Sequence, residues 1–251
     1  MFYPADEDEL RREVRAFLGS AKVDRASTPK AIVAPHAGYV YSGPVAGSAY
    51  AQLAARADEI SRVVLFGPSH RVFFTGLAYS AAETFLTPLG PVPVDRTAYE
   101  AVRDLPQVRQ YETPFEGEHC LEVQLPFLQL TLEGFRIVPF LVGDAGAEEV
   151  AQVMERLWGG DETLMVVSSD LSHYLDYESA RAIDAETSRA IEDLRPEAIG
   201  YNQACGRNPL NGLLRAAQLH GLVARTLDLR NSGDTAGPRD QVVGYGAYAF
   251  S

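Results

Sequence analysis

The chain has 251 residues, 46% of them hydrophobic and 22% charged, which is ordinary for a soluble globular protein with a sizeable core. Its formal charge of -12 counts against non-specific binding to nucleic acids or anionic membranes, because both would repel it. No apolar run approaches the roughly 20 residues of a membrane-spanning helix, and the charged, amphipathic start differs from a signal peptide. We therefore expect a cytoplasmic protein with no nucleic-acid or membrane partner.

Apolar residues at helical spacing alternate along the chain with short apolar runs of strand length. In chain order, the first half is predicted to hold a surface helix at 6–18, a polar connection at 20–29, a strand at 31–34, a helix at 43–56, a strand at 63–66, a hairpin-like excursion at 76–94, a helix at 95–105, a loop at 107–117 and a helix at 118–132 kinked by Pro126. The second half is predicted to hold strands at 135–142, 163–167, 223–229 and 242–250 and helices at 147–158, 177–194, 196–202 and 209–219. No repeat or linker interrupts this pattern, which predicts a single α/β domain over residues 1–251.

Three of the predicted strands run directly into polar residues. His36 follows the strand at 31–34, Ser69 and His70 follow the strand at 63–66, and a polar run at 168–173 follows the strand at 163–167. Ligands of open α/β sheets bind beyond the carboxyl ends of the strands. We therefore expect imidazole and carboxylate groups from three strands to meet at one edge of the sheet.

The sequence contains five histidines, and four of them lie at strand ends or loop-helix junctions. His36 and His70 could each be a turn residue bonded to local backbone, but their similar placement after two strands favours a shared metal-binding or catalytic role. His119 lies at a predicted helix start, where it could cap the helix or donate a hydrogen bond that supports the site, and we favour the second. His220 precedes Gly221 at a helix end, which favours a structural role.

Asp170 and His173 are three residues apart, a spacing that places both on one side of a turn or of a starting helix. Asp170 could orient an imidazole or act as a ligand, and His173 could act as a general base near neutral pH. The alternative is that Ser169 or Asp170 only caps a short helix.

Of the two cysteines, Cys205 has the more reactive surroundings. It lies among polar residues, and nearby Arg207 and the start of the following helix are expected to lower the pKa of its thiol. A thiolate ligand or a redox thiol is therefore predicted here. Cys120 follows His119 on a predicted amphipathic helix and is expected to pack in the core. Without an export signal, we expect no disulfide between the two cysteines.

The sequence lacks the motifs GxGxxG, GxxxxGKS/T and GxSxG, which counts against dinucleotide, P-loop and serine-hydrolase functions. Six other blocks, in order along nearly the whole chain, together resemble the Memo family, whose bacterial and archaeal members are often called AmmeMemoRadiSam system protein B. They are PHAGYVYSG (35–43), GPSH (67–70), EHCLEVQLPFL (118–128), SSDLSHY (168–174), ACGRNP (204–209) and VVGYGAYAF (242–250). The resemblance implies one α/β domain with a central, mostly parallel or mixed sheet flanked by helices, similar to the LigB-type catalytic subunit of class III extradiol dioxygenases.

The resemblance also implies a metal site. By position, its ligands fall on His36, His70 and Cys205, with Asp170 and His173 beside them as catalytic groups. The related dioxygenases hold non-haem Fe(II) with two histidines and a carboxylate. A cysteine as third ligand departs from that pattern, favours copper, zinc or thiolate-bound iron, and counts against ring cleavage. His119, Tyr39 and Ser69 are expected to support the ligands or contact a substrate.

Two classes of function follow from these expectations. The first is an oxidoreductase that uses mononuclear iron or copper with O2 or superoxide, with His173 moving the proton. The second is a non-enzymatic module that binds a small molecule, a peptide or a partner protein of a radical SAM system, through exposed Tyr39, Tyr41 and Tyr174 beside a vestigial site. A hydrolase that uses zinc-bound water is a third, less favoured alternative.

Overall fold

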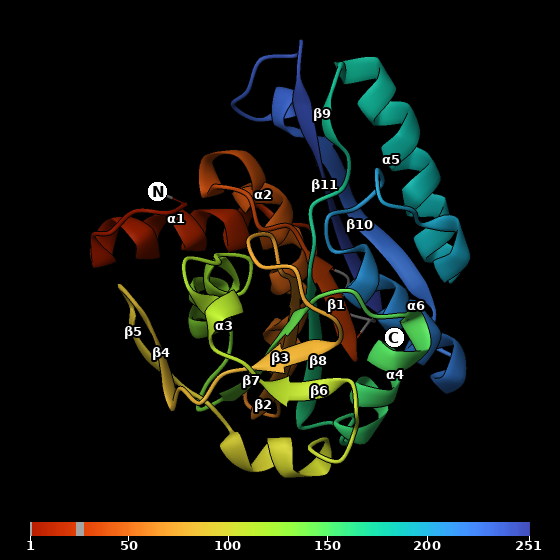
Figure 1. The fold of residues 1–251 in the computed structure, drawn as a ribbon. Helices are drawn as coiled ribbons and strands as arrows, with labels where there is room; N and C mark the ends of the chain where they lie inside the picture. The colour runs from red at the N-terminus through yellow and green to blue at the C-terminus, as the bar shows by residue number, and fades with distance from the viewer. Residues whose placement is uncertain (1, 24–27) are drawn as a thin grey trace.

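The fold is built around four parallel strands that lie side by side (Figure 1) in a computed structural model, which describes residues 2–23 and 28–251. Their order is β1 (Ala31–Ala34), β8 (Thr163–Ser168), β2 (Arg62–Pro68) and β7 (Arg136–Val142). Nearly every residue of these strands is buried, which explains their continuous apolar sequences, because helices cover both faces of a parallel sheet. Residues 24–27 of the predicted polar connection lie outside the described residues.

Further strands extend this parallel core on both sides, so the whole sheet is mixed. β11 (Val242–Phe250) pairs antiparallel with β1, while β10 (Ala224–Asn231) and the short β9 (His173–Leu175) pair antiparallel with β11. On the other side, β3 (Leu77–Tyr79) runs antiparallel to β7, and β6 (Val108–Gln110) runs parallel to β3. β4 (Thr84–Thr87) and β5 (Gly90–Pro93) form a separate hairpin, which confirms the excursion predicted at 76–94.

Helices lie on both sides of the central strands (Figure 1). One side carries α1 (Glu7–Ser20), α2 (Tyr39–Tyr50) and α3 (Leu125–Thr131), and the other carries α4 (Ala147–Arg156), α5 (Tyr177–Glu192) and α6 (Arg207–His220). The described 3-10 helices are η1 (Ala51–Arg56), η2 (Arg96–Ala101), η3 (Thr113–Phe115), η4 (Glu122–Gln124), η5 (Pro196–Ala198) and η6 (Ser232–Asp234). Buried apolar residues from α1 to β11 form one continuous core, which confirms the predicted single α/β domain. Within the described ranges, no helix is both long enough and apolar enough to cross a bilayer.

Most predicted elements are confirmed, and the differences have local causes. α2 begins at Tyr39, earlier than predicted. The helix predicted at 118–132 is instead η4 followed by α3, and the predicted kink is wrong because Pro126 lies in the first turn of α3, where its missing N–H costs little. The helices predicted at 95–105 and 196–202 are only the short η2 and η5, and β6 lies within the loop predicted at 107–117. The sequence pattern does not predict β9, because its pairing partner is the distant β11.

Candidate metal centre

The carboxyl ends of β1, β2 and β8 meet at one edge of the sheet, as the sequence predicts. His36 lies two residues beyond β1, His70 lies two residues beyond β2, and Ser168 is the last residue of β8. These three strands are parallel neighbours in the sheet. Since neighbouring parallel strands end at the same edge, both imidazoles reach the same place.

Cys205 reaches this edge from the loop that precedes α6. Its main-chain N–H donates to the Asp170 carbonyl oxygen at 3.3 Å. The next residue, Gly206, donates its N–H to the Ser169 Oγ at 3.0 Å. A Cβ at Gly206 would lie only 2.7 Å from the Ser168 carbonyl oxygen, so a glycine lets this loop pass directly against the end of β8. The thiol is thereby held beside His36.

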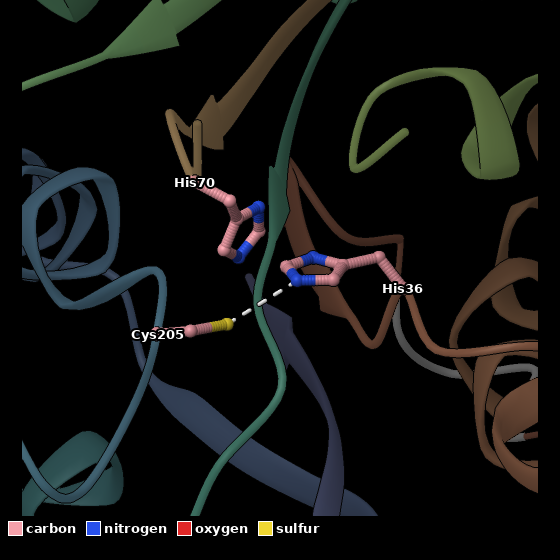
Figure 2. A group of neighbouring side chains, drawn as sticks. All are labelled: His36, His70 and Cys205. Carbon is pink, nitrogen blue, oxygen red and sulfur yellow. Dashed lines mark hydrogen bonds between the residues drawn. The ribbon is translucent and has the colours of Figure 1, made fainter. Parts of the chain in front are cut away.

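The three side chains point toward one another (Figure 2). The Cys205 Sγ lies 3.2 Å from the His36 Nε2, and the His36 and His70 ring centroids are 5.1 Å apart. One ligand atom from each residue lies within 4.8 Å of the others. Zinc-type bonds of about 2.0–2.3 Å to nitrogen and sulfur require ligand atoms within roughly 4.5 Å of one another. Small side-chain adjustments would therefore let these three residues bind one ion.

His36 is a neutral imidazole held at two points. Its main-chain N–H donates to the Asp170 Oδ1 at 2.7 Å, and its ring Nδ1 lies 2.8 Å from the Ser168 Oγ. The residue is only 6% exposed. Burial lowers the pKa of His36, although the negative charge of Asp170 opposes this effect. A neutral imidazole is the form that binds a metal ion.

His70 is held by a carboxylate. The Glu118 Oε2 accepts the His70 main-chain N–H at 2.8 Å, and the Glu118 Oε1 lies 3.0 Å from the Nδ1 of the His70 ring. Burial tends to lower the pKa of His70, but the hydrogen bond and charge of Glu118 outweigh burial and raise it. Burial likewise tends to raise the pKa of Glu118, but hydrogen bonds from His70 and Cys120 lower it to about 2. Such carboxylate–histidine pairs orient metal-binding imidazoles.

The thiol of Cys205 differs from its sequence-based expectation. Burial raises the pKa of this thiol, and the negative charge of Asp170 raises it further. Arg207 does not oppose this, because its guanidinium lies over the Tyr201 ring, 5.5 Å from the centroid. The predicted low thiol pKa is therefore wrong, and the metal-free thiol keeps its proton. A metal ion would displace that proton on binding.

Asp170 and His173 lie at the same edge but do not hydrogen-bond to each other. Asp170 is bonded to the His36 main chain, while the His173 Nδ1 lies 2.8 Å from the Leu171 carbonyl oxygen. The alternative of a helix capped by Ser169 or Asp170 is wrong, because β9 begins at His173. The Ser169 hydroxyl donates to the Asp170 carbonyl oxygen instead. Asp170 thus orients a candidate ligand rather than the candidate base.

Three residues expected to support the site have separate positions. The His119 ring lies 4.5 Å from the Phe2 ring, in the wall of a cavity beside the centre. The Ser69 hydroxyl donates to the Val72 carbonyl oxygen at 2.7 Å. Tyr39 is only 2% exposed and donates its hydroxyl to the Val123 carbonyl oxygen at 2.6 Å. The prediction that Tyr39 belongs to an exposed aromatic cluster is therefore wrong, because α2 turns it into the core.

Two further residues have the structural positions that the sequence favours. His220 ends α6, stacks on Trp158 with ring centroids 4.0 Å apart and bonds to Glu155. Cys120 is buried and donates its thiol to the Pro68 carbonyl oxygen at 3.1 Å. Packing is thus confirmed for Cys120, although it precedes η4 rather than lying on a helix.

Comparison with known proteins identifies the family of this chain. Residues 1–249 match the family described as "Memo-like protein". The chain belongs to the Memo family. It is 36% identical to a "MEMO1 family protein" of Aquifex aeolicus, over 97% of this chain and 94% of that protein. It is also 36% identical to a "MEMO1 family protein" of Aeropyrum pernix, over 98% of this chain and 95% of the relative.

A solved structure has the same fold. The crystal structure of an uncharacterized protein from Escherichia coli K12 aligns with a TM-score of 0.55 at 12% sequence identity. The alignment covers 87% of this chain and 99% of that chain. At this low identity the likeness concerns the fold alone, and the site of the Memo-family chain has to be interpreted from its own residues.

Two cavities flank the candidate centre of this Memo-family chain. The first, of about 550 Å³, is lined on one side by His36, Asp170 and His119. The second, of about 760 Å³, is lined by Cys205 and Ser69. His70 and His173 line both cavities. Volumes of this order accommodate small organic molecules, so the three ligand atoms lie where such molecules could reach them.

Three further residues hold the candidate ligands; Glu118 and Gln124 are not predicted from the sequence, and Ser168 is predicted only as part of the polar run at 168–173. Glu118 holds His70, Ser168 contacts His36, and the buried Gln124 donates to the Ser168 hydroxyl at 2.8 Å. Glu118 and Gln124 both lie in the block EHCLEVQ, where polar and apolar residues are interspersed. That mixture is the one available signal, and it does not reveal which strand end each polar residue faces.

Proposed function

We propose that this Memo-family protein holds one iron or copper ion between His36, His70 and Cys205 and acts as a metal-dependent oxidoreductase. The observation that carries the proposal is the convergence of three ligand atoms within 4.8 Å of one another, beside two cavities. Two imidazoles and one thiolate suit copper, zinc and thiolate-bound iron, and three protein ligands leave a position open. A bound iron or copper ion would supply electron transfer to O2 or superoxide.

The neighbouring residues support proton transfer to a molecule in the first cavity. His173 is exposed, and its Nδ1 faces the Leu171 carbonyl oxygen, so its Nε2 is available to a reacting group. Solvent contact lets this imidazole exchange its proton between turnovers. Asp170 keeps the His36 main chain in place through its Oδ1. In this proposal His173 is the proton carrier and Asp170 a positioning residue.

A second candidate function is the binding of a peptide or partner protein, including one from a radical SAM system. The observation that favours it is the aromatic wall of the first cavity, where Tyr41 and Tyr174 are 39% and 71% exposed. Such rings offer large apolar contact area at low entropic cost. Binding by this wall would persist in metal-free protein, whereas the oxidoreductase requires the ion.

Metal uptake is the direct test of the first proposal. The wild type and the variants His36→Ala and Cys205→Ser would be purified without oxygen and offered Fe(II), Cu(I) or Zn(II) separately. Elemental analysis should find about one ion per wild-type chain, and loss of the thiolate or imidazole ligand should remove it. O2 uptake with iron or copper but not with zinc supports the oxidoreductase, while substrate-dependent hydrolysis with zinc supports the hydrolase.

Cys120→Ser is the matched control, because Cys120 is a buried thiol that belongs to a second possible ligand group with His70 and Glu118. We expect this variant to bind metal like the wild type. Retention of one ion per chain by Cys205→Ser, together with loss in Cys120→Ser, would move the site to that second group. Circular dichroism of every variant would establish that loss of metal is not loss of the fold.

A further inference from the structure

The segment Glu118–Gln124 contacts the surroundings of both candidate histidine ligands. We infer that this segment fixes both imidazoles, in their neutral form, with the proton on Nδ1, so that Nε2 is the nitrogen of each ring that is left for an ion. The inference deepens the proposed function, on which it rests for the meaning of those two nitrogens. It assigns positioning roles to Gln124, Ser168 and Glu118, roles that the sequence analysis does not give them.

The hydrogen-bond partners of the Gln124 side chain determine which end of its amide is the NH2 group. Gln124 is fully buried, and its Nε2 lies 3.0 Å from the Pro35 carbonyl oxygen. A carbonyl oxygen only accepts, so this end of the amide must be the NH2 group. Its second N–H points to the Ser168 Oγ at 2.8 Å, and its Oε1 accepts the hydroxyl of the buried Tyr50 at 2.8 Å. The Ser168 hydroxyl therefore accepts a hydrogen bond from Gln124.

The Ser168 hydroxyl has a single proton, and its neighbours determine where that proton is donated. The Ser168 Oγ lies 2.6 Å from the Cys120 carbonyl oxygen, which again can only accept, so the hydroxyl donates there. Its remaining neighbour is the His36 Nδ1 at 2.8 Å. With the proton of the hydroxyl already committed, the imidazole must be the donor. His36 therefore carries its proton on Nδ1 and has a lone pair on Nε2.

The position of Cys205 agrees with this assignment. The Cys205 Sγ lies 3.2 Å from the His36 Nε2. A protonated thiol can donate to that lone pair, but it can also donate to the Asp170 carbonyl oxygen 3.6 Å away, and its sulfur could then accept from an Nε2–H. The contact is therefore compatible with the Nδ1–H form, and the hydrogen bonds of Ser168 decide the tautomer. With the His36 proton on Nδ1, the metal-free centre is closed by an S–H···N contact. An ion that displaces the thiol proton would find the nitrogen and the sulfur already adjacent.

The other end of the segment fixes His70. The ionised Glu118 carboxylate is an acceptor only, and its Oε1 lies 3.0 Å from the His70 Nδ1. The proton of the neutral His70 ring is therefore on Nδ1 as well. The same carboxylate accepts the main-chain N–H groups of His119 and Cys120 at 2.9 and 3.0 Å. One short segment thus bonds to the His70 ring directly and reaches the His36 ring through Ser168.

Nitrogen NMR of the imidazole rings in metal-free, 15N-labelled protein tests the inference directly, because protonated and unprotonated ring nitrogens differ in chemical shift. Wild-type His36 and His70 should both show Nδ1–H and an unprotonated Nε2 at a pH at which both rings are neutral. Ser168→Ala removes the acceptor for the His36 Nδ1–H, so we expect His36 to shift toward the Nε2–H form while His70 stays unchanged. Zinc affinity should fall by about 10–100-fold, the usual effect of removing a partner behind a metal ligand.

Ser42→Ala is the matched control. Ser42 is buried, and its hydroxyl donates to the Ala37 carbonyl oxygen at 2.8 Å without contacting either ring. This variant loses a comparable buried hydrogen bond and should keep both tautomers and the zinc affinity of the wild type. Ser168→Thr keeps the hydroxyl and should restore the Nδ1–H form of His36. This rescue separates positioning from a general loss of stability.

Two outcomes would overturn the inference: a wild-type His36 protonated on Nε2, or an unchanged His36 tautomer in folded Ser168→Ala. If Ser168→Ala fails to fold, the wild-type spectrum still decides the matter. Nδ1–H tautomers in a wild type that binds no metal would support the positioning network and reject the proposed function. Metal uptake by a wild type whose metal-free His36 carries Nε2–H would support the proposed function and reject the positioning network.

Discussion

Two buried carboxylates near the candidate centre, Glu118 and Asp184, have pKa values shifted in opposite directions. Only 5% of the Glu118 side chain and 3% of Asp184 is exposed. Burial raises the pKa of Asp184 to about 6, and the hydrogen bond from the Ser172 main-chain N–H only partly opposes this effect. Burial also acts on Glu118, yet its pKa falls to about 2 because donors from His70 and Cys120 surround it.

The number of donors explains the difference. Glu118 lies at a turn, where the main-chain N–H groups of His70, His119 and Cys120 all point at its carboxylate. Asp184 projects from the middle of α5, where main-chain N–H groups are used within the helix. A Cβ at Gly244 would lie 2.0 Å from the Asp184 Oδ2, so the carboxyl group is pressed against β11. Burial alone therefore does not decide whether a carboxylate stabilises this fold.

The largest effect is expected at Glu118. Glu118→Ala should lower the free energy of unfolding by about 3 kcal/mol, because it leaves several inward-facing N–H groups without an acceptor. Glu118→Gln keeps one acceptor oxygen and should cost about 1 kcal/mol. Urea unfolding of the metal-free variants at pH 7 would measure both values. A Glu118→Ala variant as stable as the wild type would mean that water replaces the carboxylate.

The sequence predicts the part of the site that strand order determines. His36 and His70 follow apolar runs of strand length, and parallel strands carry their carboxyl ends to one edge. Cys205 is predicted as a site residue from its polar surroundings and from the family resemblance. The block that holds Glu118 is also visible in the sequence. Its partner His70 lies 48 residues away, however, and no local pattern specifies that pairing.

Other features depend on tertiary packing and cannot be obtained from local sequence. The pKa of the Cys205 thiol is raised because the fold buries it, although Arg207 is close in sequence. Tyr39 faces the core because α2 begins one turn earlier than its composition predicts. β9 exists only because β11 provides a partner. In each case a long-range contact outweighs the local preference.

Asp184 should give an effect of the opposite sign. Asp184→Asn keeps an acceptor for the Ser172 N–H and removes a buried charge, so it should stabilise the protein at pH 7. The pKa of Asp184 is raised from 3.8 to about 6, which corresponds to a difference of up to about 3 kcal/mol. The increase in the free energy of unfolding of Asp184→Asn over the wild type should reach its full size above pH 6 and should disappear as the pH falls toward 4.

The pH dependence separates the two carboxylates. A raised pKa means that the folded state binds the proton of Asp184 more tightly than the unfolded state does. The protonated Asp184 therefore contributes to the stability of the wild type at low pH, and this contribution is lost as the pH rises from about 4 through about 6. The lowered pKa of Glu118 means that its contribution is present above about 4.5 and is lost as the pH falls toward 2. Urea unfolding of Asp184→Asn and wild type at pH 4, 5, 6 and 7 would reveal the first trend. A constant difference across this range would contradict the assignment to Asp184.

An exposed carboxylate gives the smallest expected effect and tests the role of burial. Glu112 accepts the Ser80 hydroxyl at 2.6 Å and the Ala81 N–H at 2.7 Å, so local donors surround it much as they surround Glu118. These hydrogen bonds lower the pKa of Glu112. Because Glu112 is exposed, water can form hydrogen bonds in place of the Ser80 hydroxyl and the Ala81 N–H. Glu112→Gln should therefore change the free energy of unfolding by less than about 0.5 kcal/mol. A loss as large as that of Glu118→Ala would show that donor number outweighs burial, since the two carboxylates differ chiefly in exposure.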